Sequence, residues 1–217
     1  MSLSLYGYWR SSASYRVRIA LNLKGLNFEY IPVHLLKEGG QQRKDNYKLL
    51  NPSMLVPSLV DINTGLTLTQ SLAIIEYLDE QYPTNIQLIP KNIEDRARIR
   101  SLSQDLACDV QPLANLRVLQ TLKLKFSAQD DDTKEWAKDW ITRGLNAFEV
   151  QAQTCSGNYA YKDSASMLDA CLVPQIYSAV RFGVNMDEFP ITKSIYKRCI
   201  ALPAFADAAP EKQIDAE

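Results

Sequence analysis

The sequence is poor in the residues and segments that mark several classes of protein. Its 217 residues contain one histidine, His34, so a histidine-based acid–base mechanism and a His-rich metal site are both poorly supported. No apolar run approaches the length of a membrane span, and the start MSLSLYGYWR lacks the basic-then-apolar order of a signal peptide. These absences predict a cytoplasmic protein with no metal site and no membrane partner, in which His34 is a strand residue without a catalytic role.

Cysteine pairs and an excess of one charge are absent as well. The four cysteines lie far apart in expected helices, with no C-x-x-C pair: Cys108, Cys155, Cys171 and Cys199. This spacing argues against a disulfide framework or a dithiol motif, and we expect the cysteines to be buried small apolar residues. Lys and Arg number 24 against 25 Asp and Glu, and they are scattered, so no basic face is available and nucleic acid is not an expected partner.

The first third of the chain alternates short apolar runs with helical patterns. Strands are expected at residues 3–8, 27–35, 56–62 and 66–70, and helices at residues 12–24, 41–50 and 71–81. The last two strands are separated by Asn63-Thr64-Gly65, which is a hairpin turn signal. The opening strand–helix–strand unit should therefore be parallel and right-handed, and a hairpin and a helix should complete a compact domain.

Beyond Tyr82-Pro83 the strand-like alternation stops, and long helical stripes follow. The expected helices cover residues 99–116 with a kink at Pro112, 136–152, 166–182 and 189–200, and the tail after Pro203 is expected to be irregular. Ser166 and Asp169 form a capping-box variant, and the tryptophans Trp136 and Trp140 are expected to pack in the core. The predicted organisation is a first domain over 1–82, a linker over 83–93 and an all-helical domain over 94–217.

Two hydroxyl residues, Ser11 and Ser12, stand where the first strand passes into the first helix. Either can serve as the N-cap, and the amides there face outward at the positive end of the helix dipole. A hydroxyl in that position can also donate to a sulfur anion and lower the pKa of a thiol. Arg16 and Arg18 follow in the second turn. The junction is therefore either a plain helix cap or a binding site for an anionic or thiolate ligand.

Two further places suggest a peptide ligand. Val56-Pro57 precedes a strand, and a cis bond there would turn the Val56 backbone toward solvent, where it could pair with an extended peptide; the alternative is an ordinary loop proline. Gln70-Ser71 lies at the next strand-to-helix junction and offers a carboxylate a second helix N-terminus. Two helix N-termini and one exposed backbone edge describe a site for a short acidic peptide.

These residues lie within stretches that resemble the zeta class of the glutathione transferase superfamily, whose members include maleylacetoacetate isomerase and maleylpyruvate isomerase. The matching stretches are YWRSSASYRVRIALNLKG, KEGGQQ, LNPSMLVPSLVD, QSLAIIEYLDEQYP, DVQPLANLRVL and CLVPQIYSAVRF, and they cover most of the chain. The resemblance implies a thioredoxin-like α/β domain that binds glutathione as cofactor, followed by an all-α helical bundle, in a homodimer.

The resemblance also assigns residues to the cofactor. Ser11 would donate to the glutathione thiolate, with Ser12 beside it. The resemblance also implies that Gln42 contacts the glycyl end of glutathione and Val56 its cysteinyl backbone. Gln70 and Ser71 would bind the γ-glutamyl carboxylate. Gln111 and Asn115 would reach glutathione from the long helix, and Gln111 would do so from the other subunit.

Three arginines occur where isomerases of this class hold substrate carboxylates: Arg10, Arg117 and Arg181. Arginine suits the task because its planar fork binds a carboxylate bidentately and stays charged. The implied reaction is a cis-to-trans isomerisation of a dicarboxylic enone in aromatic amino-acid catabolism. The glutathione thiolate adds to the double bond, the bond rotates, and elimination restores it as trans.

Departures from the class pattern leave alternatives open. Ala13 stands where the class usually has a cysteine after the two serines, and YKDSASMLDA replaces a Gly-Asp pair followed by a Thr-x-Ala-Asp helix start. One alternative is a general glutathione transferase acting on α-halo acids or small electrophiles, and another is a glutathione-binding protein without turnover. A tyrosine, Tyr6 or Tyr8, could in principle activate the thiol in place of the serines.

Overall fold

The computed structural model describes residues 2–83 and 86–217, and these form two units. The first combines Met1–Ile89 with Leu202–Glu217, and the second is Pro90–Ala201. Residues 84 and 85 of the predicted linker lie outside the described residues. The grouping differs from the predicted division at the C-terminal end, where the last part of the chain packs with the first unit.

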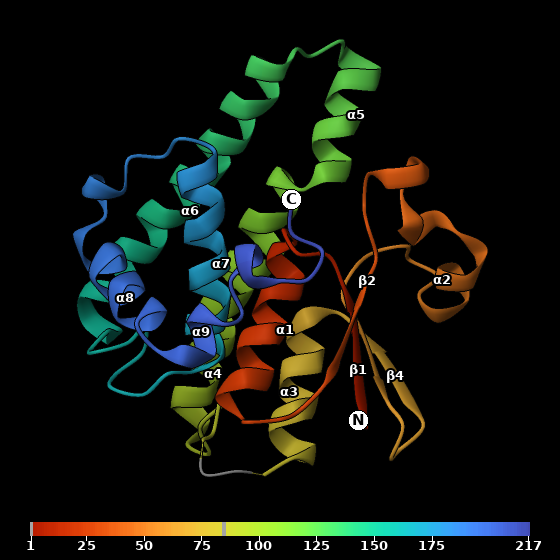
Figure 1. Ribbon diagram of the computed structural model, residues 1–217. Coiled ribbons are helices and arrows are strands. Elements are labelled where there is room, and N and C mark those ends of the chain that lie inside the picture. Colours follow the sequence, from red (N-terminus) through yellow and green to blue (C-terminus); the bar gives the residue numbers. More distant parts are fainter. Residues whose placement is uncertain (1, 84–85) are drawn as a thin grey trace. The chain divides into compact units, whose positions relative to one another are not determined.

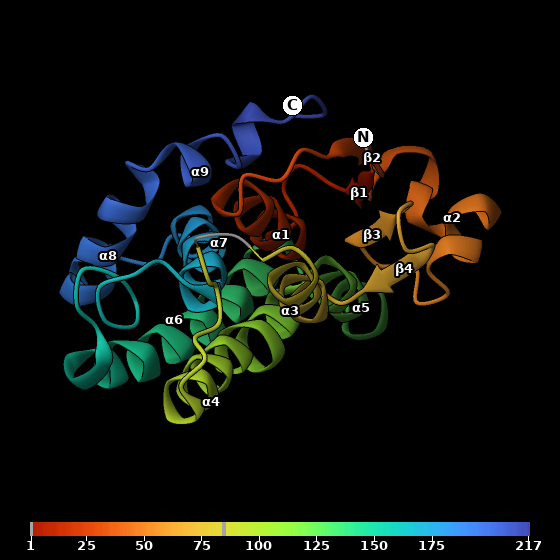
Figure 2. The ribbon, with the colours of Figure 1, turned by 90° about the horizontal axis from the view of Figure 1, so that it is seen from below.

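The first unit is built on one mixed sheet with the strand order β2-β1-β3-β4. Its elements are β1 Leu3–Gly7, α1 Ser12–Leu23, β2 Glu29–Pro32, α2 Asp45–Leu50, β3 Ser58–Asp61, β4 Leu66–Thr69 and α3 Ser71–Gln81. Strand β1 is parallel to β2 and antiparallel to β3, as expected for a strand–helix–strand unit followed by a hairpin. Figures 1 and 2 show α1 and α3 on one side of the sheet and α2 on the other.

Strand register determines which segments meet at one edge of the sheet. Tyr6 pairs with Ser58, Ser58 with Thr69, and Gly7 with Pro32. Because β3 runs opposite to its neighbours, the ends of β1, β2 and β4 lie at the same edge as the start of β3. The segments that follow β1, β2 and β4 and the segment that precedes β3 therefore emerge together.

Asp79 extends the first unit beyond the predicted boundary at residue 82. Its carboxylate accepts from the buried Lys24 ammonium at 2.9 Å and from the backbone N–H groups of Leu88 and Ile89 at 3.0 and 3.1 Å. Leu88 is fully buried. These contacts hold the segment after α3 against the first unit.

The C-terminal tail is ordered, so the expectation of an irregular tail was wrong. Helix α9 covers Pro203–Ala206, and a 3₁₀ turn follows at Pro210–Lys212. Phe205 is fully buried, and Asn22 of α1 donates to the Ala204 carbonyl at 3.0 Å. The tail is folded by these contacts with the first unit, for which its own sequence gives no periodic signal.

The second unit contains helices and no strand of the sheet. Its elements are α4 Ile93–Gln104, a π-helical stretch Asp105–Val110, a 3₁₀ turn Gln111–Ala114, α5 Leu116–Phe126, α6 Asp130–Cys155, α7 Met167–Arg181 and α8 Pro190–Ile200. Helix α7 packs against α4, α6 and α8. The interruption expected at Pro112 is present, and it begins earlier, at Asp105. The predicted α/β fold followed by an all-helical bundle is confirmed.

Asp169 ties the start of α7 to the loop before it, as the capping-box pattern predicts. Its carboxylate accepts from the Ser166 N–H at 2.8 Å, the Ser166 hydroxyl at 2.9 Å and the Ala160 N–H at 2.8 Å. Burial raises the pKa of Asp169 to about 6, although these hydrogen bonds act in the opposite direction. The box is therefore a fully buried carboxylate held by four donors, since the Cys199 thiol also donates to it at 3.7 Å.

Two expectations about side-chain packing were wrong. Trp136 is 36 % exposed, because the buried stripe of α6 runs through Ala137, Ile141 and Leu145 instead. The indole N–H of Trp136 donates to the Leu113 carbonyl at 3.0 Å. Among the cysteines, Cys171 and Cys199 are buried, Cys155 is half-buried and Cys108 is exposed.

In the described ranges, no helix combines the length and apolar character needed to cross a membrane.

Candidate functional site

The predicted site residues of the first unit gather at the sheet edge defined by the strand register. Ser11 follows β1, Gln42 follows β2, Val56 precedes β3, and Gln70 and Ser71 follow β4. Four segments distant in sequence are thus brought to one edge by the sheet. Each segment presents a different kind of polar group.

Ser11 is the N-cap of α1. Its Oγ accepts from the Ser14 N–H at 3.2 Å, and its own N–H donates to the Tyr8 carbonyl at 3.0 Å, which closes a turn over residues 8–11. The cap uses a lone pair of the hydroxyl oxygen, so the hydroxyl hydrogen is still available to an acceptor. Capping and donation to an anion are therefore compatible at this residue. Ser12 is half-buried and begins the helix.

The two arginines of α1 are buried, so they do not form an open anion site. Arg16 donates to the Ser71 hydroxyl at 3.1 Å and so links the start of α3 to α1. Arg18 is 1 % exposed and donates to the main-chain carbonyls of Ala208 and Trp9, both at 2.9 Å. Their role is to hold the segments around the edge.

The Val56-Pro57 bond is cis, so the structure selects the first of the two alternatives left open by the sequence. Val56 is half-buried, and within the described part of the chain neither its N–H nor its carbonyl has a hydrogen-bond partner. Such a backbone segment beside a strand can pair with an extended peptide.

The start of α3 favours an anion. Gln70 precedes the helix with φ at 72° and ψ at 112°, makes no side-chain cap, and no acidic residue lies in the first turn. The first amides of the helix are therefore not satisfied by a side chain, and the helix dipole adds to their attraction for negative charge. Ser71, the first helical residue, is 6 % exposed and offers its N–H at this point.

Gln42 lies in the 3₁₀ turn Gln41–Arg43, which follows a segment that His34 organises. His34 follows β2 instead of lying within it, and its Nδ1 accepts from the N–H groups of Leu36 at 3.2 Å and Lys37 at 2.8 Å. Its backbone N–H donates to the Gln41 side chain at 2.9 Å. Gln42 is 7 % exposed, and its Oε1 has no partner among the described residues. A buried amide without its full set of hydrogen bonds is suited to a polar ligand group.

Arg10 projects from the turn beside Ser11. Its guanidinium carbon lies 5.1 Å from the centre of the Trp9 ring, within cation–π distance. Tyr8 is buried, and its ring packs edge-on against the rings of Trp9 and His34 at 5.9 and 4.9 Å. This packing favours a structural role for Tyr8 over activation of a thiol.

The remaining predicted residues belong to the second unit. Gln111 begins the 3₁₀ turn, Asn115 is the N-cap of α5 and accepts from the Arg117 N–H at 3.3 Å, and Arg117 is exposed. These three follow one another on a single stretch. Arg181 comes from the last turn of α7, is exposed, and lies with its guanidinium carbon 5.0 Å from the Phe182 ring centre. All four therefore have side chains at least partly accessible within their unit.

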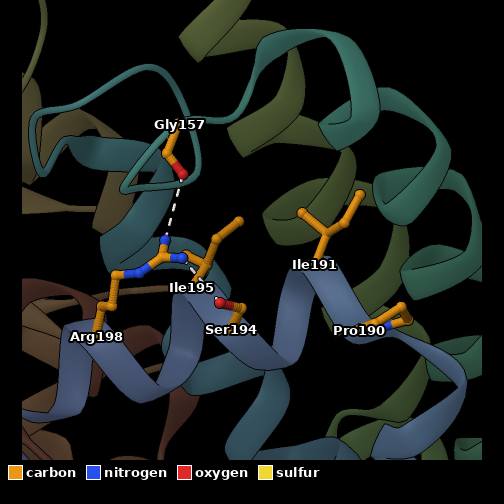
Figure 3. Close-up of a pocket in the computed structure, with 6 residues that line it drawn as sticks. All are labelled: Gly157, Pro190, Ile191, Ser194, Ile195 and Arg198. Carbon is orange, nitrogen blue, oxygen red and sulfur yellow. Dashed lines mark hydrogen bonds between the residues drawn. The ribbon is translucent and has the colours of Figure 1, made fainter.

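Two surface hollows contain none of the predicted site residues. A hollow of about 440 Å³ in the first unit is lined by Tyr6, Ile31, Pro32, Val33, Gln41, Lys44, Asn46, Tyr47 and Leu50. Another, of about 280 Å³, lies beside α8 (Figure 3). There Arg198 donates to the Gly157 carbonyl at 3.3 Å, the Asn158 carbonyl at 2.7 Å and the Ser194 hydroxyl at 2.8 Å, which fixes α8 to the loop before α7. Arg198 therefore has a structural role in this hollow.

Comparison with known proteins identifies relatives along the whole chain. Residues 5–86 match the glutathione S-transferase N-terminal domain family. A probable maleylacetoacetate isomerase from Vibrio cholerae is 49 % identical over 216 residues, which are 100 % of this chain and 99 % of that protein.

Solved structures agree with this relationship. A holo structure of a bacterial maleylpyruvate isomerase, a zeta-class glutathione S-transferase, is 41 % identical with a TM-score of 0.93 and covers 99 % of this chain and 100 % of its own. A maleylacetoacetate isomerase from Methylobacterium extorquens, solved with malonate and glutathione bound, is 36 % identical with a TM-score of 0.93 and covers 99 % of each chain.

Proposed function

The chain belongs to the zeta class of the glutathione transferase family, and we propose that it is a glutathione-dependent cis–trans isomerase of a dicarboxylic enone, either maleylacetoacetate or maleylpyruvate. The main support for this proposal is the set of polar groups that the fold brings together at one edge of the sheet. A helix-capping hydroxyl at Ser11, an unpaired backbone at Val56 and an uncapped helix start at Ser71 lie there together. This set of donors and acceptors fits a small peptide with a thiol and free carboxylates.

The residues present suit glutathione group by group. The first amides of α3, with Gln70 and Ser71, would hold the γ-glutamyl carboxylate. The Val56 N–H and carbonyl would pair with the cysteinyl backbone. Gln42, with its unpartnered Oε1, would face the glycyl end. Gln111 and Asn115 would add contacts from the helical unit, Gln111 from the partner subunit of a homodimer.

Ser11 is the residue that would hold the reacting sulfur of glutathione in its ionised form. Bound glutathione supplies a thiolate nucleophile whose reversible addition to the double bond allows that bond to rotate. The Ser11 hydroxyl would donate to the sulfur anion, and the α1 dipole favours negative charge at the same point. Ser12 adjoins it at the first position of the helix. Ala13, which replaces the class cysteine, removes no group that this route needs.

Arginine side chains anchor the substrate. Arg10 projects from the turn next to Ser11, and Arg117 and Arg181 are exposed side chains of the helical unit. A guanidinium holds a carboxylate with two parallel hydrogen bonds, which fixes its direction as well as its position. The relative from Methylobacterium extorquens was solved with malonate, a dicarboxylate, together with glutathione. A cytoplasmic location, which the lack of a disulfide among the four cysteines of the described ranges supports, completes the proposal.

The test is isomerisation of maleylacetoacetate and of maleylpyruvate by the purified chain, with and without glutathione. We expect turnover of at least one substrate that depends on glutathione and is inhibited by S-methylglutathione, which can occupy the same site but has no free thiol. Turnover that persists undiminished without the thiol would contradict the mechanism. Absence of turnover in the presence of glutathione would contradict the function.

A further inference from the structure

The turn that presents Arg10 and Ser11 is held from both sides of one residue, Trp9. The turn is closed by the Ser11 N–H, which donates to the Tyr8 carbonyl at 3.0 Å, so Trp9 and Arg10 are its central residues. The Trp9 N–H donates to Asp215 Oδ2 at 3.0 Å, and the Trp9 carbonyl accepts from Arg18 Nη2 at 2.9 Å. The polar main-chain atoms of Trp9 are therefore both engaged with partners outside the turn.

Asp215 comes from the far end of the chain. It lies 206 residues beyond Trp9 and belongs to the C-terminal segment 202–217, which packs with the first unit. Arg18 joins the same arrangement, since its Nε donates to the Ala208 carbonyl of that segment at 2.9 Å. The C-terminal segment thus reaches the turn directly through Asp215 and indirectly through Arg18.

The position of Trp9 affects two of the predicted site residues, Arg10 and Ser11. Its ring is 6 % exposed and carries the Arg10 guanidinium at 5.1 Å from the ring centre. Ser11 closes the turn through its N–H and caps α1 through its Oγ. A shift of the Trp9 backbone would displace Arg10 and the Ser11 hydroxyl together.

We propose that Asp215 is a positioning residue, which fixes the turn over residues 8–11 through the Trp9 N–H and thereby sets the positions of Arg10 and Ser11. The inference rests on the proposed function only in the roles of Arg10 and Ser11, because the Asp215 contact is independent of any ligand. Sequence reasoning missed Asp215, since nothing in the tail KQIDAE distinguishes this carboxylate from a solvated one.

Asp215 has two effects: its oxygen accepts from the Trp9 N–H, and its negative charge stabilises the buried Arg18 guanidinium. Burial lowers the pKa of Arg18, whereas Tyr30, Tyr15 and Asp215 favour its charged form. Removal of the carboxylate would therefore destabilise the buried Arg18 charge as well as free the Trp9 N–H. Asp215→Asn removes the charge and keeps an oxygen that can accept from Trp9, whereas Asp215→Ala removes both.

The experiment compares Asp215→Ala, Asp215→Asn and, as a control, Asp207→Ala, which removes an exposed carboxylate from the same segment. Because a small displacement of reacting groups is costly, we expect Asp215→Ala to lower kcat/KM for isomerisation about tenfold and to move its pH profile to higher pH. Asp215→Asn should stay within about twofold of the wild type, as should Asp207→Ala. A fall in Tm without a change in kcat/KM or in the pH profile would overturn the proposal, as would equal impairment by Ala and Asn.

Hydrogen exchange at the Trp9 amide of the wild-type chain tests the Trp9–Asp215 hydrogen bond directly. This test remains available even if Asp215→Ala fails to fold or the wild type shows no turnover. Protection of this amide, lost or weakened in Asp215→Ala where that variant folds, is the expected result. An amide that exchanges at the rate of an unstructured peptide would overturn the proposal. Lack of wild-type isomerisation with a protected Trp9 amide would count against the proposed function and not against the Asp215 contact.

Discussion

At the scale of single residues, side chains of the proposed site use one atom for the fold and leave another atom for the ligand. Ser11 accepts a helix-capping hydrogen bond from Ser14 and keeps its hydroxyl hydrogen for another acceptor. Gln42 donates to the Leu35 carbonyl at 3.4 Å and leaves its Oε1 without a partner among the described residues. The sequence could suggest such residues from their type and place. It could not show which atom remains available, because that depends on partners brought by the fold.

Ser11→Ala should lower kcat by roughly a hundredfold, because the donor to the sulfur anion is lost. The substitution also removes a helix cap, which costs about 1 kcal/mol of folding free energy, whereas glycine at an N-cap costs only a few tenths. Ser11→Gly therefore serves as the matched variant with the cap loss reduced. Steady-state kinetics and thermal unfolding of both variants are the measurements. Wild-type turnover in either variant would remove Ser11 from the mechanism.

Arg181→Ala should raise the KM for a dicarboxylate substrate more than the KM for a neutral electrophile, because only the former has a carboxylate to lose. Arg143→Ala is the control, since Arg143 is an exposed arginine of the same unit that pairs with Asp139 at 2.9 Å. Kinetics with the two substrates side by side decide the point. Equal effects of Arg181→Ala on both would show that the arginine does not anchor a carboxylate.

At the scale of elements, local signals determined most of what the sequence could predict. Helix α3 has the predicted bounds of 71–81, and the α7 capping box forms where Ser166 and Asp169 indicate it. Both signals come from hydrogen-bonding or apolar patterns within a few residues. The π-helical stretch from Asp105 carries no comparable local mark, so only the interruption at Pro112 was expected.

The α7 capping box makes stability depend on pH in a stated direction. Asp169 has its pKa raised by burial from 3.8 to about 6, so between these values the folded chain keeps a proton that the unfolded chain has released. This group's contribution to the free energy of unfolding is therefore largest at low pH and falls as pH rises through about 6. Asparagine cannot titrate, so the free energy of unfolding of the wild type minus that of Asp169→Asn should fall over this interval.

Urea unfolding of wild type and Asp169→Asn at a series of pH values between about 4 and 7 measures this difference, and other carboxylates largely cancel in it. A difference that is constant with pH, or that rises, would show that Asp169 is not the buried acid with a raised pKa.

At the scale of the whole molecule, the chain closes on itself within the first unit. Residues 202–217 pack with the sheet domain although 112 residues of the helical unit, Pro90–Ala201, separate the two parts in sequence. The long-range contacts of Arg18 and Asp215 could not be read from the sequence, because their hydrogen-bond partners lie in segments far apart along the chain. The segments of the sheet edge, by contrast, could be foreseen from the strand pattern and the family resemblance.

Removal of residues 202–217 should abolish cooperative unfolding of the first unit. It would strip Arg18 of the Ala208 carbonyl and the Asp215 charge, and an uncompensated buried charge costs about 3–5 kcal/mol, a large part of the stability of a domain. A chain ending at Asp215 is the control, because it loses the exposed Lys37–Glu217 ion pair and keeps the buried contacts. Thermal unfolding followed by circular dichroism would refute the expectation if both truncated chains melted like the full chain.

The most direct measurement is the ionisation of glutathione in its complex with the protein, followed as thiolate absorbance against pH. If the sheet edge works as argued, the bound thiol will titrate well below the value of about 8.5 for an ordinary thiol, and Ser11→Ala will return it toward that value. A bound thiol that titrates like the free peptide in the wild-type protein would contradict the claim that this edge stabilises a thiolate.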